Sequence, residues 1–476
     1  MSSQTIRSIG EGNWGATCSD STNVTKAGHH ELVSIVGTML DFCDAVHHLH
    51  NTIRDINKLL KLKFLMSMLK GIIKYFSKST YSTTILQKEH NLAGDDKPVK
   101  ALKKIGKTHF GTYWTAANAL DPCLPHICNL VVAKSIKFKN NKIQGMFMNR
   151  ASGKYSEFEQ SILQYIMIVA PIIRALWSLE AAHANASDIF IFWLAIIATL
   201  NDLFSKGPNV TGIPVSLACE VTAIINKWYH EFFTNEVYFV ALTLDPRYPN
   251  SDFLKKPTAN VTTIAIPALS QRTGQCTPLP YPHAYTHVKD FLKEKLQKDL
   301  AHYVANPDSV LATSIFKVLS AAEVMSGLRH QLEAFWHGEW PFNQQVKDSN
   351  PLAWWGSLQD HPHARVLAHL AIKIFLVLVN SMPDKHTNST ITCQNAQMLV
   401  DMIQIGQWYR KHQNKDYVLS KYRPVVKFQN IEESVLQAVQ TGSTDDESVA
   451  DIDGVADLDN EDEAEDKLLE SEIDEH

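Results

Sequence analysis

Apolar side chains recur at three- and four-residue spacing over residues 28–88 and 158–235 of this chain. That spacing places them on one face of an α-helix, whereas the alternation that is typical of half-buried strands is rare here. Residues 285–303 show an amphipathic helical pattern, and residues 350–410 read as a compact block of helices. The chain is therefore expected to be mainly helical.

Two short segments favour other structure. Residues 10–20 (GEGNWGATCSD) are typical of a strand that runs into a loop, and residues 236–244 (EVYFVALTL) fit either a strand or a buried helix. We expect a small sheet in which residues 14–18 pair with residues 237–244. Residues 257–282 are rich in proline and threonine, which predicts a long loop.

Size and composition limit the class of protein. The 476 residues exceed the roughly 250–300 at which a single core stops growing, so at least two domains are expected. The longest apolar run, 189–200, spans 12 residues, and a membrane span needs about 20. The seven cysteines are scattered without a CxxC pair, which favours a reducing compartment. We expect no membrane segment, and no small-molecule substrate is evident.

The net charge of −5 is divided unevenly along the chain. Residues 445–475 carry 16 carboxylates and one lysine, which leaves +10 on the remainder. A solvated, disordered tail and an intramolecular mimic of phosphate are both consistent with this segment. The body has two lysine clusters that could contact phosphates, with a plain solvated face as the alternative: Lys100, Lys103, Lys104, Lys107, Lys134, Lys137, Lys139 and Lys142.

Asp20 follows an apolar run and precedes Ser-Thr-Asn. Two or three carboxylates at strand ends can hold a pair of Mg²⁺ ions that act on a phosphodiester. A single Asp is more often a turn or helix-capping residue. The residues alone leave both interpretations open.

A series of segments adds weight to the first interpretation. They are CSDSTNVTKA, CDAVHHLHNTIRDINKL, KGIIKYFSKSTYSTTIL, KTHFGTYWTAANAL, VALTLDPRY and NPLAWWGSLQDHPHARVLAHLAIKIFLVLVNSMPDKHTNSTITCQNAQMLVDMIQIGQWYR. In this order they resemble fungal DNA transposases of the hAT superfamily, over about residues 5–412. The last segment resembles the family's C-terminal dimerisation region and is the most specific.

The resemblance implies a mainly α fold. It would hold a remnant ribonuclease-H-like α/β core with an incomplete sheet, a large helical insertion and a helical C-terminal dimerisation region. The implied parts are a partial core, the insertion, a continuation of the core with the proline- and threonine-rich loop, the dimerisation region, and a linker with the acidic tail. Their bounds are 1–124, 125–235, 236–349, 350–412 and 413–476.

The family binds metal through Asp, Asp and Glu, and this pattern is incomplete here. Asp20 matches the second Asp, but Lys385 stands at the position of the Glu. An ammonium group cannot bind Mg²⁺ and repels it. The neighbouring Asp384 would point about 100° away on a helix. Only 19 residues precede Asp20, too few for the family's zinc finger and first Asp. We expect no metal site and no cofactor, with Mg²⁺ only if catalysis survives.

Further residues receive roles from the resemblance. Cys43, His47 and His48 match the family's Cys/His pair and are expected to support the core. Apolar residues of the last region are candidates for self-association or for the core; they are Trp354, Trp355, Leu370, Phe375, Met402 and Ile405.

Two functions follow from these patterns. One is a transposon-derived, catalytically inactive protein that self-associates as a homodimer or larger homo-oligomer and binds DNA weakly. The other is an active transposase or nuclease subunit whose missing N-terminal ligands come from a longer gene product or a partner. The resemblance implies a nuclear protein; without it, a cytoplasmic one is expected.

Overall fold

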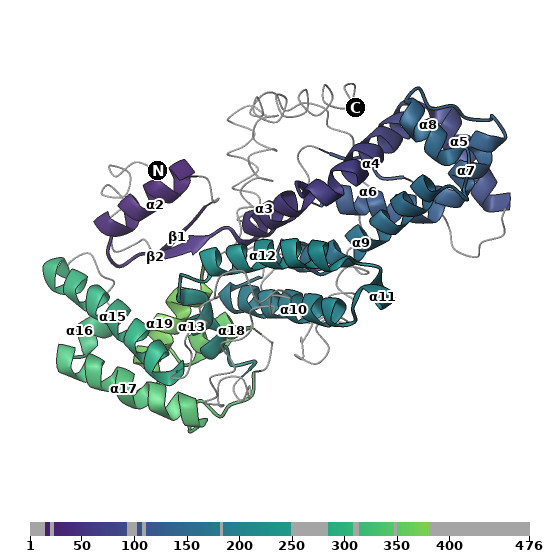
Figure 1. Cartoon of the computed structure of the whole chain (residues 1–476). Helices are drawn as coiled ribbons and strands as arrows, with labels where there is room; N and C mark the ends of the chain where they lie inside the picture. Colours follow the sequence, from purple (N-terminus) through teal and green to yellow (C-terminus); the bar gives the residue numbers. More distant parts are fainter. Residues whose placement is uncertain are drawn as a thin grey trace. The chain divides into compact units, whose positions relative to one another are not determined.

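The computed structural model describes residues 15–19, 23–92, 102–106, 111–180, 184–248, 284–307, 314–346, 350–377 and 379. All of them belong to one compact unit, Met1–Ser381 with Ser420–Ala438. The second unit, Met382–Leu419 with Val439–His476, lies outside the described residues. The described part is mainly helical, as the sequence predicts (Figure 1).

The described residues form one small sheet of two parallel strands, β1 (Ala16–Ser19) and β2 (Leu40–Cys43). Ala16 pairs with Leu40 and Ser19 with Cys43, and helix α2 (Asn23–Ile35) connects the strands. The expected strand near residue 16 is confirmed. The expected pairing of residues 14–18 with residues 237–244 is wrong, because Val237–Thr243 forms helix α13. All seven residues of α13 are buried, and a short apolar run buried on all sides has the same pattern in a helix as in a strand.

The helices that come next along the chain include α9, which is the longest helix of the described residues. They are α3 (Ala45–Asn57), α4 (Leu60–Lys78), α5 (Thr80–Leu92), α6 (Thr112–Leu120), the 3₁₀ turn η2 (Asp121–Cys123), α7 (Leu124–Val132), α8 (Asn141–Phe147), α9 (Gly153–Leu179), α10 (Ala186–Ser205), α11 (Pro208–Thr211) and α12 (Val215–Phe232). Helix α9 packs against α3, α4 and α6. Helices on both sides of residue 124 therefore share one core, and the four expected domain boundaries stay predictions.

The remaining described helices follow α13. They are α15 (Ala284–Ala305), α16 (Ile315–Val318), α17 (Ala321–His337), α18 (Pro351–Ser357) and α19 (Arg365–Phe375). Helix α19 packs against α13, α15, α17 and α18, and these helices lie together in Figure 1. The amphipathic helix expected at residues 285–303 is confirmed as α15.

Helix α10 contains the apolar run 189–200 and packs against α9 and α13. Within the described residues, α9 and α10 are long and apolar enough to cross a membrane, but 67% and 61% of their apolar windows are buried inside the fold. This packing accounts for their composition, since a core helix needs apolar residues on every face that meets a neighbour.

Gly111 provides a test of this packing. It caps α6 with a φ of 75°, and an added Cβ would lie 2.5 Å from Ile173 Cδ1 in α9. We expect Gly111→Ala to lower the free energy of unfolding by about 1–3 kcal/mol, because it combines left-handed strain with a clash. Urea unfolding followed by circular dichroism measures this change.

The control is Gly145→Ala in α8, where an added Cβ meets nothing within 4 Å. It should leave stability unchanged or raise it by up to about 1 kcal/mol. Equal effects of the two substitutions would contradict the packing described here.

Candidate functional site

The carboxyl ends of β1 and β2 meet at one edge of the sheet, where Ser19 pairs with Cys43. The candidate Asp20 follows Ser19 and lies outside the described residues. At the end of β2, the Asp44 carboxylate is buried and accepts a hydrogen bond of 3.0 Å from the backbone N–H of His47. Asp44 is therefore the N-cap of α3.

The last described residues return to this same edge. The backbone N–H of Ala45 donates to the carbonyl of Val379 over 3.1 Å. Lys385 lies six residues further along and outside the described residues.

The backbone of Cys43 is held by Tyr238 of α13. Its N–H donates to the tyrosine oxygen over 2.9 Å, and the hydroxyl donates back to the Cys43 carbonyl over 3.3 Å. Burial raises the pKa of Tyr238 well above its ordinary value, so the hydroxyl keeps its proton at neutral pH. This pair of hydrogen bonds joins the sheet to α13.

His48 lies in an aromatic environment. Its ring is buried and contacts the rings of Trp193, Trp228 and Phe232, with centroids 4.5–5.8 Å apart. The part of the chain that the structure describes has no group of three or more His, Cys, Asp or Glu residues that could hold a metal ion. The surroundings of His48 are those of a core residue, and His47 lies beside it in the first turn of α3.

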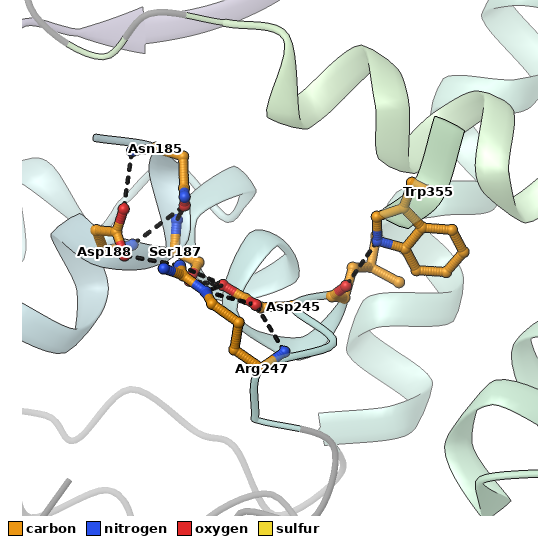
Figure 2. Close-up of polar contacts among 7 residues, drawn as sticks. Asn185, Ser187, Asp188, Asp245, Arg247 and Trp355 are labelled. Carbon is orange, nitrogen blue, oxygen red and sulfur yellow. Dashed lines mark hydrogen bonds and ion pairs between the residues drawn. The ribbon is translucent and has the colours of Figure 1, made fainter. Parts of the chain in front are cut away.

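A buried ionic network lies where α10 begins and α13 ends (Figure 2). Arg247 Nη2 contacts Asp188 Oδ1 at 2.7 Å and Asp245 Oδ2 at 2.6 Å, and Arg247 Nε donates to both Asp245 oxygens over 3.0 Å. Ser187 also donates to Asp245, whose side chain is fully buried. Burial alone would lower the pKa of Arg247, but Asp188 and Asp245 raise it well above its ordinary value. The guanidinium therefore stays charged, and we call these four residues the Arg247 network.

Two neighbouring contacts extend the Arg247 network. Asn185 and Asp188 form a capping box at the start of α10. Trp355 of α18 is fully buried, and its indole N–H donates to the Leu244 carbonyl over 2.9 Å. The network thus connects α10, α13 and α18. Its contacts are saturated within the protein, which indicates a structural role rather than a catalytic one.

Basic side chains are frequent between the start of α3 and the first turn of α9, in helices and in loops. The described part of residues 45–154 has sixteen lysines and arginines but only three carboxylates, Asp55, Glu89 and Asp121. All but one of the sixteen are exposed, and Lys70 is half-buried. We call them the basic surface: Arg54, Lys58, Lys61, Lys63, Lys70, Lys74, Lys78, Lys88, Lys103, Lys104, Lys134, Lys137, Lys139, Lys142, Arg150 and Lys154.

An aromatic contact joins two parts of the basic surface. Phe138 lies between Lys137 and Lys139, is buried, and packs on Tyr75 of α4 with ring centroids 4.4 Å apart. This contact holds the loop before α8 against the helix that carries Lys74 and Lys78. Of the lysines that the sequence singled out, the structure therefore brings Lys137 and Lys139 next to α4.

The other expected lysines divide into two groups. Lys103 and Lys104 are exposed, whereas Lys100 and Lys107 lie outside the described residues. The sequence interpretation missed the lysines of α4. Their signal was readable, because Lys70, Lys74 and Lys78 recur every four residues and so share one helix face.

The expected dimerisation residues lie inside the fold where the structure describes them. Trp354, Trp355, Leu370 and Phe375 are all buried within the chain itself. Their apolar character is thus accounted for by the core. Met402 and Ile405 lie outside the described residues, and an interface in the region 350–412 stays a prediction.

Comparison with known proteins adds no assignment: no family model matches this chain, and no curated protein matches it.

The Arg247 network predicts a large cost for its removal. Arg247→Met leaves the buried carboxylate of Asp245 and the half-buried carboxylate of Asp188 without their cation, and we expect the free energy of unfolding to fall by about 3–5 kcal/mol. Urea unfolding of the full chain measures it. The control is Lys206→Met, which removes the exposed Lys206–Asp202 pair and should change stability by less than about 1 kcal/mol. If both variants unfold at the same urea concentration, the network does not hold these helices together.

Proposed function

We propose that this chain is a transposon-derived protein, related to hAT transposases, that binds the nucleic-acid backbone without cutting it. The observation that carries this proposal is the basic surface, with sixteen basic residues against three carboxylates in the described part of residues 45–154. An excess of exposed positive charge of this kind attracts phosphate chains and accelerates their association. The chain's overall net charge of −5 conceals it.

The sheet supports the relationship to transposases. Two parallel strands joined by a helix have their carboxyl ends at one edge of the sheet. The resemblance to transposases implies that the second metal-binding Asp, matched here by Asp20, follows such a strand end. The hydrogen bond from Ala45 to Val379 brings the last described residue to the same edge.

Lys385 supports the absence of cleavage. Cleavage of a phosphodiester by two metal ions needs carboxylates that hold both ions. At the position of the family's Glu, this chain has an ammonium group that repels a divalent cation. The same charge attracts phosphate, so the substitution disfavours cutting and favours binding.

Contact with the phosphate backbone of a nucleic acid alone does not distinguish one base sequence from another. We therefore propose binding that is independent of sequence and sensitive to salt. Self-association through residues 350–412 and a nuclear location remain part of the proposal by resemblance. Any surface for self-association has to use residues other than the four buried ones described above.

Salt dependence tests the basic surface. Each phosphate contact contributes about 0.9 to the slope of log affinity against log salt. A variant with Lys74, Lys78, Lys137 and Lys139 changed to Gln should bind a labelled 30-base-pair duplex more weakly, with a slope shallower by up to about 3–4. Fluorescence anisotropy of the full chain at several salt concentrations measures both quantities.

The matched control changes four exposed lysines elsewhere, namely Lys206, Lys293, Lys298 and Lys317. This variant has the same net charge, and its slope should stay close to that of the unchanged chain. Equal slopes for the two variants would place the binding outside the basic surface and defeat this part of the proposal.

A second experiment tests the absence of cleavage. The full chain is incubated with supercoiled plasmid and either Mg²⁺ or Mn²⁺, and the plasmid forms are separated on a gel. We expect the plasmid to stay supercoiled. Metal-dependent nicking that disappears in Asp20→Asn would show that a working metal centre persists despite Lys385.

A further inference from the structure

A groove of about 930 Å³ runs along α17 and the start of α19. Glu323, His330 and Glu333 of α17 line it, together with Glu339 and Trp340 of the following turn and Arg365 of α19. The groove is shallow and largely open to solvent. None of these residues belongs to the basic surface, so the groove is a separate feature of the fold.

Trp340 gives the groove an accessible aromatic ring. Its side chain is 59% exposed, and its ring contacts those of His361 and His363 with centroids 4.6 and 5.5 Å apart. These two imidazoles support part of the ring and leave the remainder open to solvent. An exposed indole is a preferred partner for ammonium and guanidinium groups, which are attracted by the charge distribution of the ring.

The charges of the groove point to the same kind of ligand. Three carboxylates face one guanidinium, so the groove carries −2 when its histidines are neutral. Glu323 caps α17 by accepting hydrogen bonds from Ser320. Glu333 and Glu339 are exposed and, within the described part of the chain, form no ion pair. Two carboxylates beside Trp340 are therefore available to a cation.

We propose that this groove binds an extended peptide segment that carries lysine or arginine side chains. A basic side chain of the peptide lies over Trp340 between Glu333 and Glu339. A nucleotide or an acidic peptide fits less well, since its negative charge would meet three carboxylates. The contacts are exposed, so the affinity is modest and the selectivity lies in charge.

The experiment observes Trp340 itself in the full chain, because the acidic residues 445–475 also attract cationic peptides. The chain has ten tryptophans, and labelling them with ¹⁵N gives ten indole N–H signals by NMR. The Trp340 signal is the one that is absent in Trp340→Phe. A seven-residue peptide of alternating lysine and glycine, capped at both ends, is titrated into the chain and should shift that signal.

Charge variants and other ligands decide the outcome. The double variant Glu333→Gln, Glu339→Gln should bind the peptide about three- to tenfold more weakly at Trp340, while its other nine indole signals stay in place. Asp290→Asn, an exposed acid on α15 outside the groove, should have no effect. The proposal is overturned if the Trp340 signal does not move, if it moves equally in the double variant, or if a glutamate–glycine peptide or AMP shifts it instead.

Discussion

An arginine and two carboxylates are buried together between helices that are otherwise almost wholly apolar. Helices α10 and α13 pack closely, but hydrophobic packing is non-directional and does not by itself select one register. The contacts of Arg247 with Asp188 and Asp245, at 2.6–2.7 Å, are directional and would cost several kcal/mol if broken. We infer that they select the arrangement of α10 and α13. The indole of Trp355 then attaches α18 to the end of α13, and α19 packs on both.

The helical architecture could be predicted from the sequence because the apolar residues on the buried face of a helix recur at three- and four-residue spacing within one segment. Helices α9, α10, α12 and α15 all carry this pattern or a long apolar run, and so they were readable. Strand β2 was not predicted from the sequence, because its four residues (LDFC) are too few to interrupt the helical periodicity around them. The pairing of β1 was assigned to the wrong segment for a related reason. Helix α13 has no polar face, and a segment without alternation between apolar and polar residues does not distinguish a helix from a strand.

The candidate sites could be predicted only where the spacing of residues along one helix or one short segment brings their side chains together. The lysines of α4 share a face by their four-residue interval, but their proximity to Lys137 and Lys139 depends on Phe138 packing on Tyr75. In the same way, the segment LDPRY marks Asp245 and Arg247, but Ser187 and Asp188 lie almost sixty residues earlier. The groove at Trp340 depends on α17 meeting the start of α19. Contacts between distant segments are set by the packing of whole helices, which no local pattern contains.

The proposed loss of cutting and retention of binding need no rearrangement of the core. The Arg247 network and the contacts of Trp355 join α10, α13 and α18, and the proposal places the loss of the metal-binding carboxylate at Lys385, outside the described residues. A carboxylate that binds metal contributes little to packing, so its replacement leaves the fold intact while it removes a metal ligand. In the proposed function, lysine at that position also reverses the charge, from one that attracts Mg²⁺ to one that attracts phosphate. On these physical grounds, a charge change at one metal ligand is enough to stop metal binding without a change in the core.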